Sequence, residues 1–218
     1  MRSTIRLLLA ATLAVAVPGL AVAQDHAQTK HSAAAAKPMS AKTVETRSAM
    51  RDLWVDHVFW VRNVVVATLA KNDAAAKASE QQVVANAKAL AGAVEPFYGA
   101  AAKDGMFKLL AGHYGAIKAY LVATDAGDAN AQGKATSDLM ANAEEIAVFL
   151  SKANPNLPKD TVNGLLQAHG GHHIAQIQEL KAGQYDAEAK TWEDMKAHMY
   201  VIADALTQAI AKQFAAKF

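Results

Sequence analysis

The sequence predicts an all-α fold, a six-helix bundle built from three helical hairpin repeats of about 56 residues each. Two observations predict it. Apolar residues recur at intervals of three and four along most of the chain, which is the spacing of one face of an α-helix. In addition, His57, His113 and His169 stand 56 residues apart, and each follows a pair of apolar residues by three positions. A fixed period of this length over three units indicates a repeated supersecondary unit.

Five breaks divide the helical pattern, and each contains Gly, Pro, Asn or Asp. In chain order, the breaks are residues 71–73, 96–105, 125–128, 154–158 and 182–184. We therefore expect helices over residues 43–71, 74–95, 103–125, 129–153, 159–182 and 185–215. No stretch of the sequence has the pattern of a strand.

The N-terminus has the features of a secretory signal peptide over residues 1–23. A basic start and an apolar stretch precede Ala21-Val22-Ala23, which fits the small-x-small cleavage pattern. Residues 24–42 are expected to form a flexible leader because they show no apolar stripe, and residues 43–218 are expected to form the helical bundle domain. Cleavage predicts a periplasmic or secreted protein that is not attached to a membrane. A retained N-terminal anchor is the alternative.

Composition excludes several partners and kinds of site. The chain has 22 basic and 20 acidic residues, and Arg2 and Arg6 belong to the signal peptide, so the mature chain has 20 of each and no formal net charge. Electrostatics therefore gives no reason to expect nucleic acid or anionic lipid as a partner. The absence of cysteine excludes disulfides, thiolate ligands and c-type haem attachment, and it suits an oxidising periplasm.

The 56-residue step links polar residues on every expected helix. The six positions are His57, Asn86, His113, Asn142, His169 and His198. The two members of each hairpin are 29 residues apart and centred on its turn. Each therefore lies about 22 Å from that turn at about 1.5 Å per helical residue. We expect all six residues to lie in one layer of the bundle.

The four histidines of this layer, His57, His113, His169 and His198, lie within apolar stripes. A buried imidazole needs a hydrogen bond or a metal, and imidazoles that converge inside a helical bundle commonly bind one. The pattern therefore predicts a transition metal site, with copper and zinc as the favoured ions. Asn86 and Asn142 are expected to lie behind the ligands and to orient them. The alternative is that each histidine bonds a neighbouring helix and fixes its register.

Further residues extend this prediction. His173 lies four residues after His169 on the same face, and Glu145 lies one turn after Asn142, so either is a candidate ligand. A solvent-exposed position is the alternative for Glu145, and His172 is expected at the edge of its face. A separate N-terminal motif is Gln24, Asp25 and His26, where an amine, two amides and an imidazole would form a square-planar set for Cu(II) or Ni(II).

The sequence favours handling or storage of the metal over catalysis, because no acid–base or nucleophilic set accompanies the histidines. Two helices with Glu-x-x-His pairs, as in di-iron bundles, are absent. Haem b is not expected, since methionines in Ala-rich helices are more often core residues than ligands. Two other functions stay open: a structural or sensor interaction module without metal, and a metalloenzyme that uses Glu145.

The stretch Leu53-Trp54-Val55-Asp56-His57-Val58-Phe59-Trp60-Val61-Arg62 resembles the opening motif Leu-Trp-x-x-His-Val-x-Trp-x-Arg of a poorly characterised family of bacterial helical proteins. The C-terminal Gln213-Phe214 and Lys217-Phe218 also match the end of that family. The resemblance implies a helical bundle and the positions of the motifs, without an activity. The family pattern Asn-x-x-acid is present at Asn142 and Glu145, whereas Ala89 replaces the acid after Asn86.

Overall fold

A computed structural model of the chain describes residues 39–218. The expected signal peptide, most of the leader and the motif Gln24, Asp25 and His26 lie outside the described residues. The helices are α1 (Ala41–Leu69), α2 (Asp73–Tyr98), α3 (Ala100–Ala126), α4 (Ala129–Ala153), α5 (Lys159–Ala182) and α6 (Tyr185–Gln213), followed by the short 3-10 helix η1 (Ala215–Lys217). The predicted all-α six-helix fold is confirmed, and residues 39–218 contain no strand.

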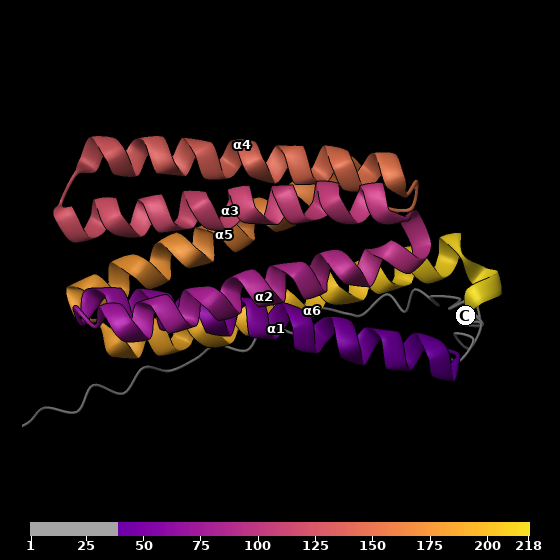
Figure 1. The fold of residues 1–218 in the computed structure, drawn as a ribbon, viewed down its shortest axis with the longest axis horizontal. Coiled ribbons are helices and arrows are strands. Elements are labelled where there is room, and N and C mark those ends of the chain that lie inside the picture. Colours follow the sequence, from indigo (N-terminus) through magenta and orange to yellow (C-terminus); the bar gives the residue numbers. More distant parts are fainter. Residues whose placement is uncertain (1–38) are drawn as a thin grey trace, which may run out of the picture. The chain divides into compact units, whose positions relative to one another are not determined.

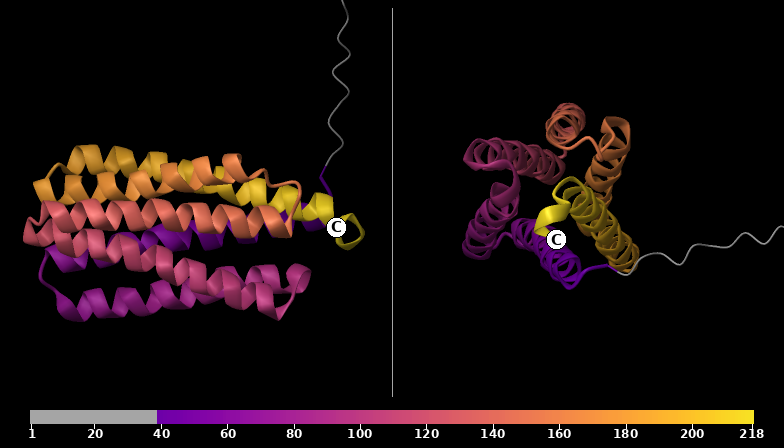
Figure 2. Two further views of the ribbon diagram at one scale, coloured as in Figure 1. Left: turned by 90° about the horizontal axis from the view of Figure 1, so that it is seen from above. Right: turned by 90° about the vertical axis from the view of Figure 1, so that its right-hand side faces the viewer.

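The six helices run roughly along one long axis (Figure 1). Each helix packs against the next one in the chain, and α6 packs against α1, so that the bundle closes on itself (Figure 2). The helices α1, α3 and α5 also contact one another. This second set of contacts positions the functional site, because it brings together one face of the first helix of every hairpin.

Local sequence sets where the helices begin. The hydroxyl oxygen of Ser40 accepts from the backbone N–H of Thr43 at 3.0 Å and caps α1, which is why this helix begins at Ala41, two residues earlier than expected. Asn72 and Asp128 cap α2 and α4 in the same way, with side-chain oxygens 3.1 and 3.0 Å from the backbone nitrogen three residues on.

The expected break over residues 96–105 is wrong. Pro96 lies in the last turn of α2, the helix continues to Tyr98, and Gly99 alone joins α2 to α3. Proline removes only one N–H donor, so the last turn persists, and the N–H of Gly99 still donates to the carbonyl oxygen of Glu95 at 2.8 Å. Gly99 has a φ of 84°, which turns the chain within a single residue.

The apolar core has two parts along the bundle, and a polar layer lies between them. One part contains Trp54 and Leu110, whereas the other contains Val61 and Ile117. His57 lies between Trp54 and Val61 on α1, and the histidine of α3 lies between Leu110 and Ile117. None of the helices in residues 39–218 is long and apolar enough to cross a membrane.

Candidate metal centre

Four histidines meet in the interior of the bundle: His57 from α1, His113 from α3, and His169 and His173 from α5. Each offers one ring nitrogen, and these four nitrogens all lie within 4.8 Å of one another. The side chains are between 1% and 3% exposed. We call these residues the histidine cluster. Its members meet because α1, α3 and α5 contact one another and because a spacing of four residues puts His169 and His173 on one face of α5.

Burial keeps the cluster uncharged. Desolvation, followed by the nearby His113, lowers the pKa of His57 to about 3. Desolvation also lowers the pKa of His113 to about 4, although the hydrogen bond to Asn142 acts in the opposite direction. The pKa values of His169 and His173 are well below the ordinary value, first through desolvation and then through the other histidines. Neutral imidazoles have the free lone pairs that metal binding requires.

Most ring nitrogens of the cluster have no hydrogen-bond partner. Nε2 of His57, Nε2 of His113, both nitrogens of His169 and Nε2 of His173 are buried and unpaired. An unsatisfied buried polar atom costs about 1–3 kcal/mol, and here five such atoms share one region. A metal ion would satisfy several of them at once.

Asn142 orients one of the imidazoles. Nδ1 of His113 lies 3.1 Å from Oδ1 of Asn142, and Nδ2 of Asn142 donates to the carbonyl oxygen of Leu109 at 3.1 Å. Because the amide nitrogen of Asn142 donates to that carbonyl, the amide oxygen faces the ring and accepts a hydrogen bond from the N–H at Nδ1. The proton at Nδ1 leaves Nε2 of His113 as the atom with a free lone pair.

The three positions related by the 56-residue step make the same contact on α2, α4 and α6. Each side chain bonds the carbonyl oxygen of the leucine that lies four residues before a cluster histidine. The pairs are Asn86 with Leu53 at 2.9 Å, Asn142 with Leu109 at 3.1 Å, and Nε2 of His198 with Leu165 at 2.8 Å. His198 is therefore the counterpart of the two asparagines in this structure and ties α6 to α5.

The structure brings together four of the sequence-predicted ligands and separates the others. His198 lies outside the cluster, with its ring 5.5 Å from that of the partly buried His172. Glu145 is exposed on α4 and does not join the cluster. Asn86 contacts the carbonyl of Leu53, and its own Oδ1 is buried without a partner. The layer prediction was correct about height along the helices but did not determine which side chains face the centre.

A partly buried ion pair between Arg62 and Glu188, which no pattern in the sequence indicates, lies near the cluster. Nε and Nη2 of Arg62 donate to the two carboxylate oxygens of Glu188, at 2.6 and 2.7 Å. Nε2 of Gln176 donates to the same carboxylate at 2.8 Å. Gln176 follows His173 by three residues on α5. No spacing pattern links these three residues, which come from α1, α5 and α6. Because Arg62 already neutralises it, Glu188 is a structural carboxylate rather than a free acid.

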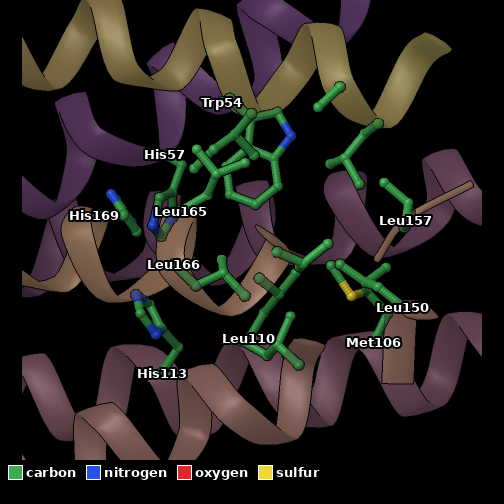
Figure 3. Close-up of a pocket in the computed structure, with 15 residues that line it drawn as sticks. Trp54, His57, Met106, Leu110, His113, Leu150, Leu157, Leu165, Leu166 and His169 are labelled. Atoms are coloured by element: carbon green, nitrogen blue, oxygen red, sulfur yellow. The ribbon is translucent and has the colours of Figure 1, made fainter. Parts of the chain in front are cut away.

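The cluster also borders a small cavity, which His57, His113 and His169 line together with apolar side chains (Figure 3). Its volume is about 30 Å³. The fourth histidine, His173, is not among the lining residues. The histidines therefore face packed protein on one side and a cavity on another.

The donor set fits a transition metal ion. Tetrahedral zinc holds its nitrogen ligands about 2.0 Å away and therefore about 3.3 Å from one another. A separation at the 4.8 Å limit of the cluster would therefore contract by about 1.5 Å on binding. Four imidazoles can hold a metal ion of this kind. No protein-family model, no curated protein and no solved structure matches the chain. The chemistry of the site is therefore the basis for its function.

Proposed function

We propose that the protein binds a transition metal ion, copper or zinc, through His57, His113, His169 and His173. The observation that carries this proposal is the convergence of four buried, neutral imidazoles with unpaired nitrogens in one region. A purely structural histidine layer would be expected to pair these nitrogens with protein groups. Asn142 and His198 have this structural role, and each forms a hydrogen bond to a backbone carbonyl of the neighbouring helix.

Charge favours copper over zinc. All four ligands are neutral, so the centre keeps the full charge of the ion in a buried, mostly apolar environment. The desolvation cost of an ion rises steeply with its charge, and this cost is smaller for univalent copper than for a divalent ion. Imidazole also suits copper, and divalent copper binds more tightly than zinc to most nitrogen sites.

Handling or storage fits the site better than hydrolysis does. A metallohydrolase needs a carboxylate or similar base near the metal. Among residues 39–218, Glu145 is exposed and Glu188 is paired with Arg62, so neither is free to act as a base at the cluster. Export to the periplasm, proposed from the pattern of residues 1–23, would place such a protein where copper and zinc enter the cell.

The proposal is tested by elemental mass spectrometry on tag-free protein after reconstitution with copper or zinc. We expect one ion per chain in the native protein and none in the triple variant His57→Ala/His113→Ala/His169→Ala. The matched control is His198→Asn, which installs the residue found at the two equivalent positions and keeps a donor for the Leu165 carbonyl. This control should retain the metal.

Two outcomes would contradict the proposal. One is a native protein that holds no metal after reconstitution, which would make the histidine layer part of a structural or sensor module. The other is equal metal content in the triple variant, which would place the ion elsewhere in the chain.

A further inference from the structure

A second pair of histidines lies beside the histidine cluster and closer to the surface of the bundle. The pair is His172 on α5 and His198 on α6, and both side chains are partly exposed. Their ring centroids are 5.5 Å apart. Within the cluster, the ring centroids are 4.5 to 6.4 Å apart, so the two outer rings are as close together as the cluster rings are.

The outer pair adjoins one member of the cluster, His169. His172 follows His169 by three residues, and residues with this spacing are neighbours on the surface of a helix. His198 bonds the carbonyl oxygen of Leu165, which lies one turn before His169 on α5. Desolvation is the main cause of the lowered pKa of His169, and the nearby His198 contributes to it. Both ring nitrogens of His169 are buried and unpaired, so this ring is able to take an ion from its neighbours.

His198 is held in the way that a metal ligand commonly is. Its Nε2 donates to the carbonyl oxygen of Leu165 at 2.8 Å, which fixes the ring and leaves Nδ1 with a free lone pair. Asn86 and Asn142 make the same contact at the equivalent positions, so the contact alone does not require an imidazole. Only position 198 adds a ring nitrogen to it.

The distance between the outer rings suits a shared ion. Two imidazoles whose nitrogens bind one zinc ion at about 2.0 Å have ring centroids about 5 to 6 Å apart. The separation of His172 and His198, 5.5 Å, lies in this range. The cluster side chains, in contrast, are only 1% to 3% exposed, so an ion from solution has to pass other side chains before it reaches them.

We propose that His172 and His198 form a second, weaker metal site through which an ion enters the histidine cluster. The inference rests on the proposed function, because the ion passes from this site to the four histidines of the cluster. Two imidazoles and water hold an ion less tightly than four imidazoles do, so the outer site fills only in passing. The transfer is a ligand exchange: a bond to an outer imidazole breaks, a bond to His169 forms, and the charge of the ion does not change.

The test measures how fast metal-free protein takes up univalent copper or zinc from a chromophoric chelator. The double variant His172→Ala/His198→Asn removes both outer imidazoles, and asparagine keeps a donor for the Leu165 carbonyl. We expect this variant to load about tenfold or more slowly than the native protein, because the ion is no longer captured next to the cluster. The final metal content, measured by elemental mass spectrometry, should be unchanged. Gln167→Ala, at an exposed position on the same helix as His172, is the control and should load at the native rate.

The outcomes separate this inference from the proposed function. A native protein that takes up neither ion would overturn the metal centre and the entry site together. Equal loading rates in the native protein and the double variant would overturn the entry site alone. A lower final metal content in the double variant would also overturn it, because the pair would then belong to the permanent centre. If circular dichroism shows that the double variant is unfolded, His172→Ala alone provides the test: it changes one partly exposed side chain and should slow loading in the same direction.

Discussion

At the scale of single residues, the two asparagines of the layer differ in role: both connect neighbouring helices, and one of them also orients a histidine ring. Asn86 and Asn142 both bond a leucine carbonyl, at 2.9 and 3.1 Å. Only Asn142 also contacts a ring nitrogen of the cluster, Nδ1 of His113, at 3.1 Å. Its amide therefore fixes the tautomer of a candidate ligand, while that of Asn86 ties α2 to α1. The pair provides a matched comparison.

We predict that Asn142→Ala lowers metal affinity by about tenfold or more, because the His113 ring loses the group that orients it. Asn86→Ala removes an equivalent bond to a backbone carbonyl without changing a ring contact, so its effect on affinity should be much smaller. Competition with a chromophoric chelator measures both affinities. Equal losses in the two variants would show that Asn142 acts only through the stability of the bundle.

At the scale of helices, the three hairpin turns share one backbone conformation. Gly127 and Gly183 end α3 and α5 with φ values of 72° and 70°, and Lys71 adopts a φ of 57° at the equivalent position after α1. A side chain at a positive φ is strained, so Lys71 is a weak point of the first turn. Its exposed side chain pairs with Asp125, which offsets part of that strain.

The variant Lys71→Gly should be more stable than Lys71→Ala by about 1 kcal/mol, because glycine adopts a positive φ without steric cost. Both variants lose the ion pair with Asp125, so the difference between their free energies of unfolding reports the backbone strain at this position alone. Urea denaturation of the two proteins gives the comparison. If alanine proves the more stable residue, the turn does not have this conformation.

The helices also show what the sequence could and could not predict. The apolar period and the breakers predicted six helices, and the 56-residue step predicted the height of the polar layer, because helical rise is uniform. The step could not show that His198 faces the Leu165 carbonyl while His173 faces the centre. That depends on how far each helix is rotated about its axis, which packing between distant helices determines. The single-residue connection at Gly99 was missed because a proline can occupy the last turn of a helix.

At the scale of the whole molecule, the buried histidines link stability to pH. The pKa values of His57 and His113, about 3 and about 4, lie below the ordinary histidine value of 6.5. The unfolded chain therefore takes up protons first as the pH falls below 6.5. The stabilisation is complete above that value and is lost as the pH falls toward the lowered values.

We predict that metal-free protein loses stability from pH 6.5 down to about pH 4. Each buried histidine should contribute up to about 1.4 kcal/mol per pH unit within this window. Urea denaturation at several pH values measures the slope, and His57→Leu, which removes one titrating group, should reduce it by one such contribution. A stability that does not change between pH 7 and pH 5 would contradict neutral burial of the cluster.

The cavity and the ion pair of Arg62 with Glu188 belong to this scale as well. The ion pair joins α1 to α6, and the cavity is lined by side chains from several helices, so no local spacing in the sequence indicates either of them. Their positions divide the interior around the cluster. An apolar space lies on the Trp54 side, and a neutralised charge pair lies beyond His173.

The most direct test of the central claim is X-ray absorption spectroscopy at the edge of the bound metal. The account predicts four imidazole nitrogens at about 2.0 Å in the native protein. It predicts three in His173→Ala and no change in His198→Asn. A centre with fewer imidazoles, a carboxylate ligand, or the loss of a ligand in His198→Asn would contradict the assignment of the metal to His57, His113, His169 and His173.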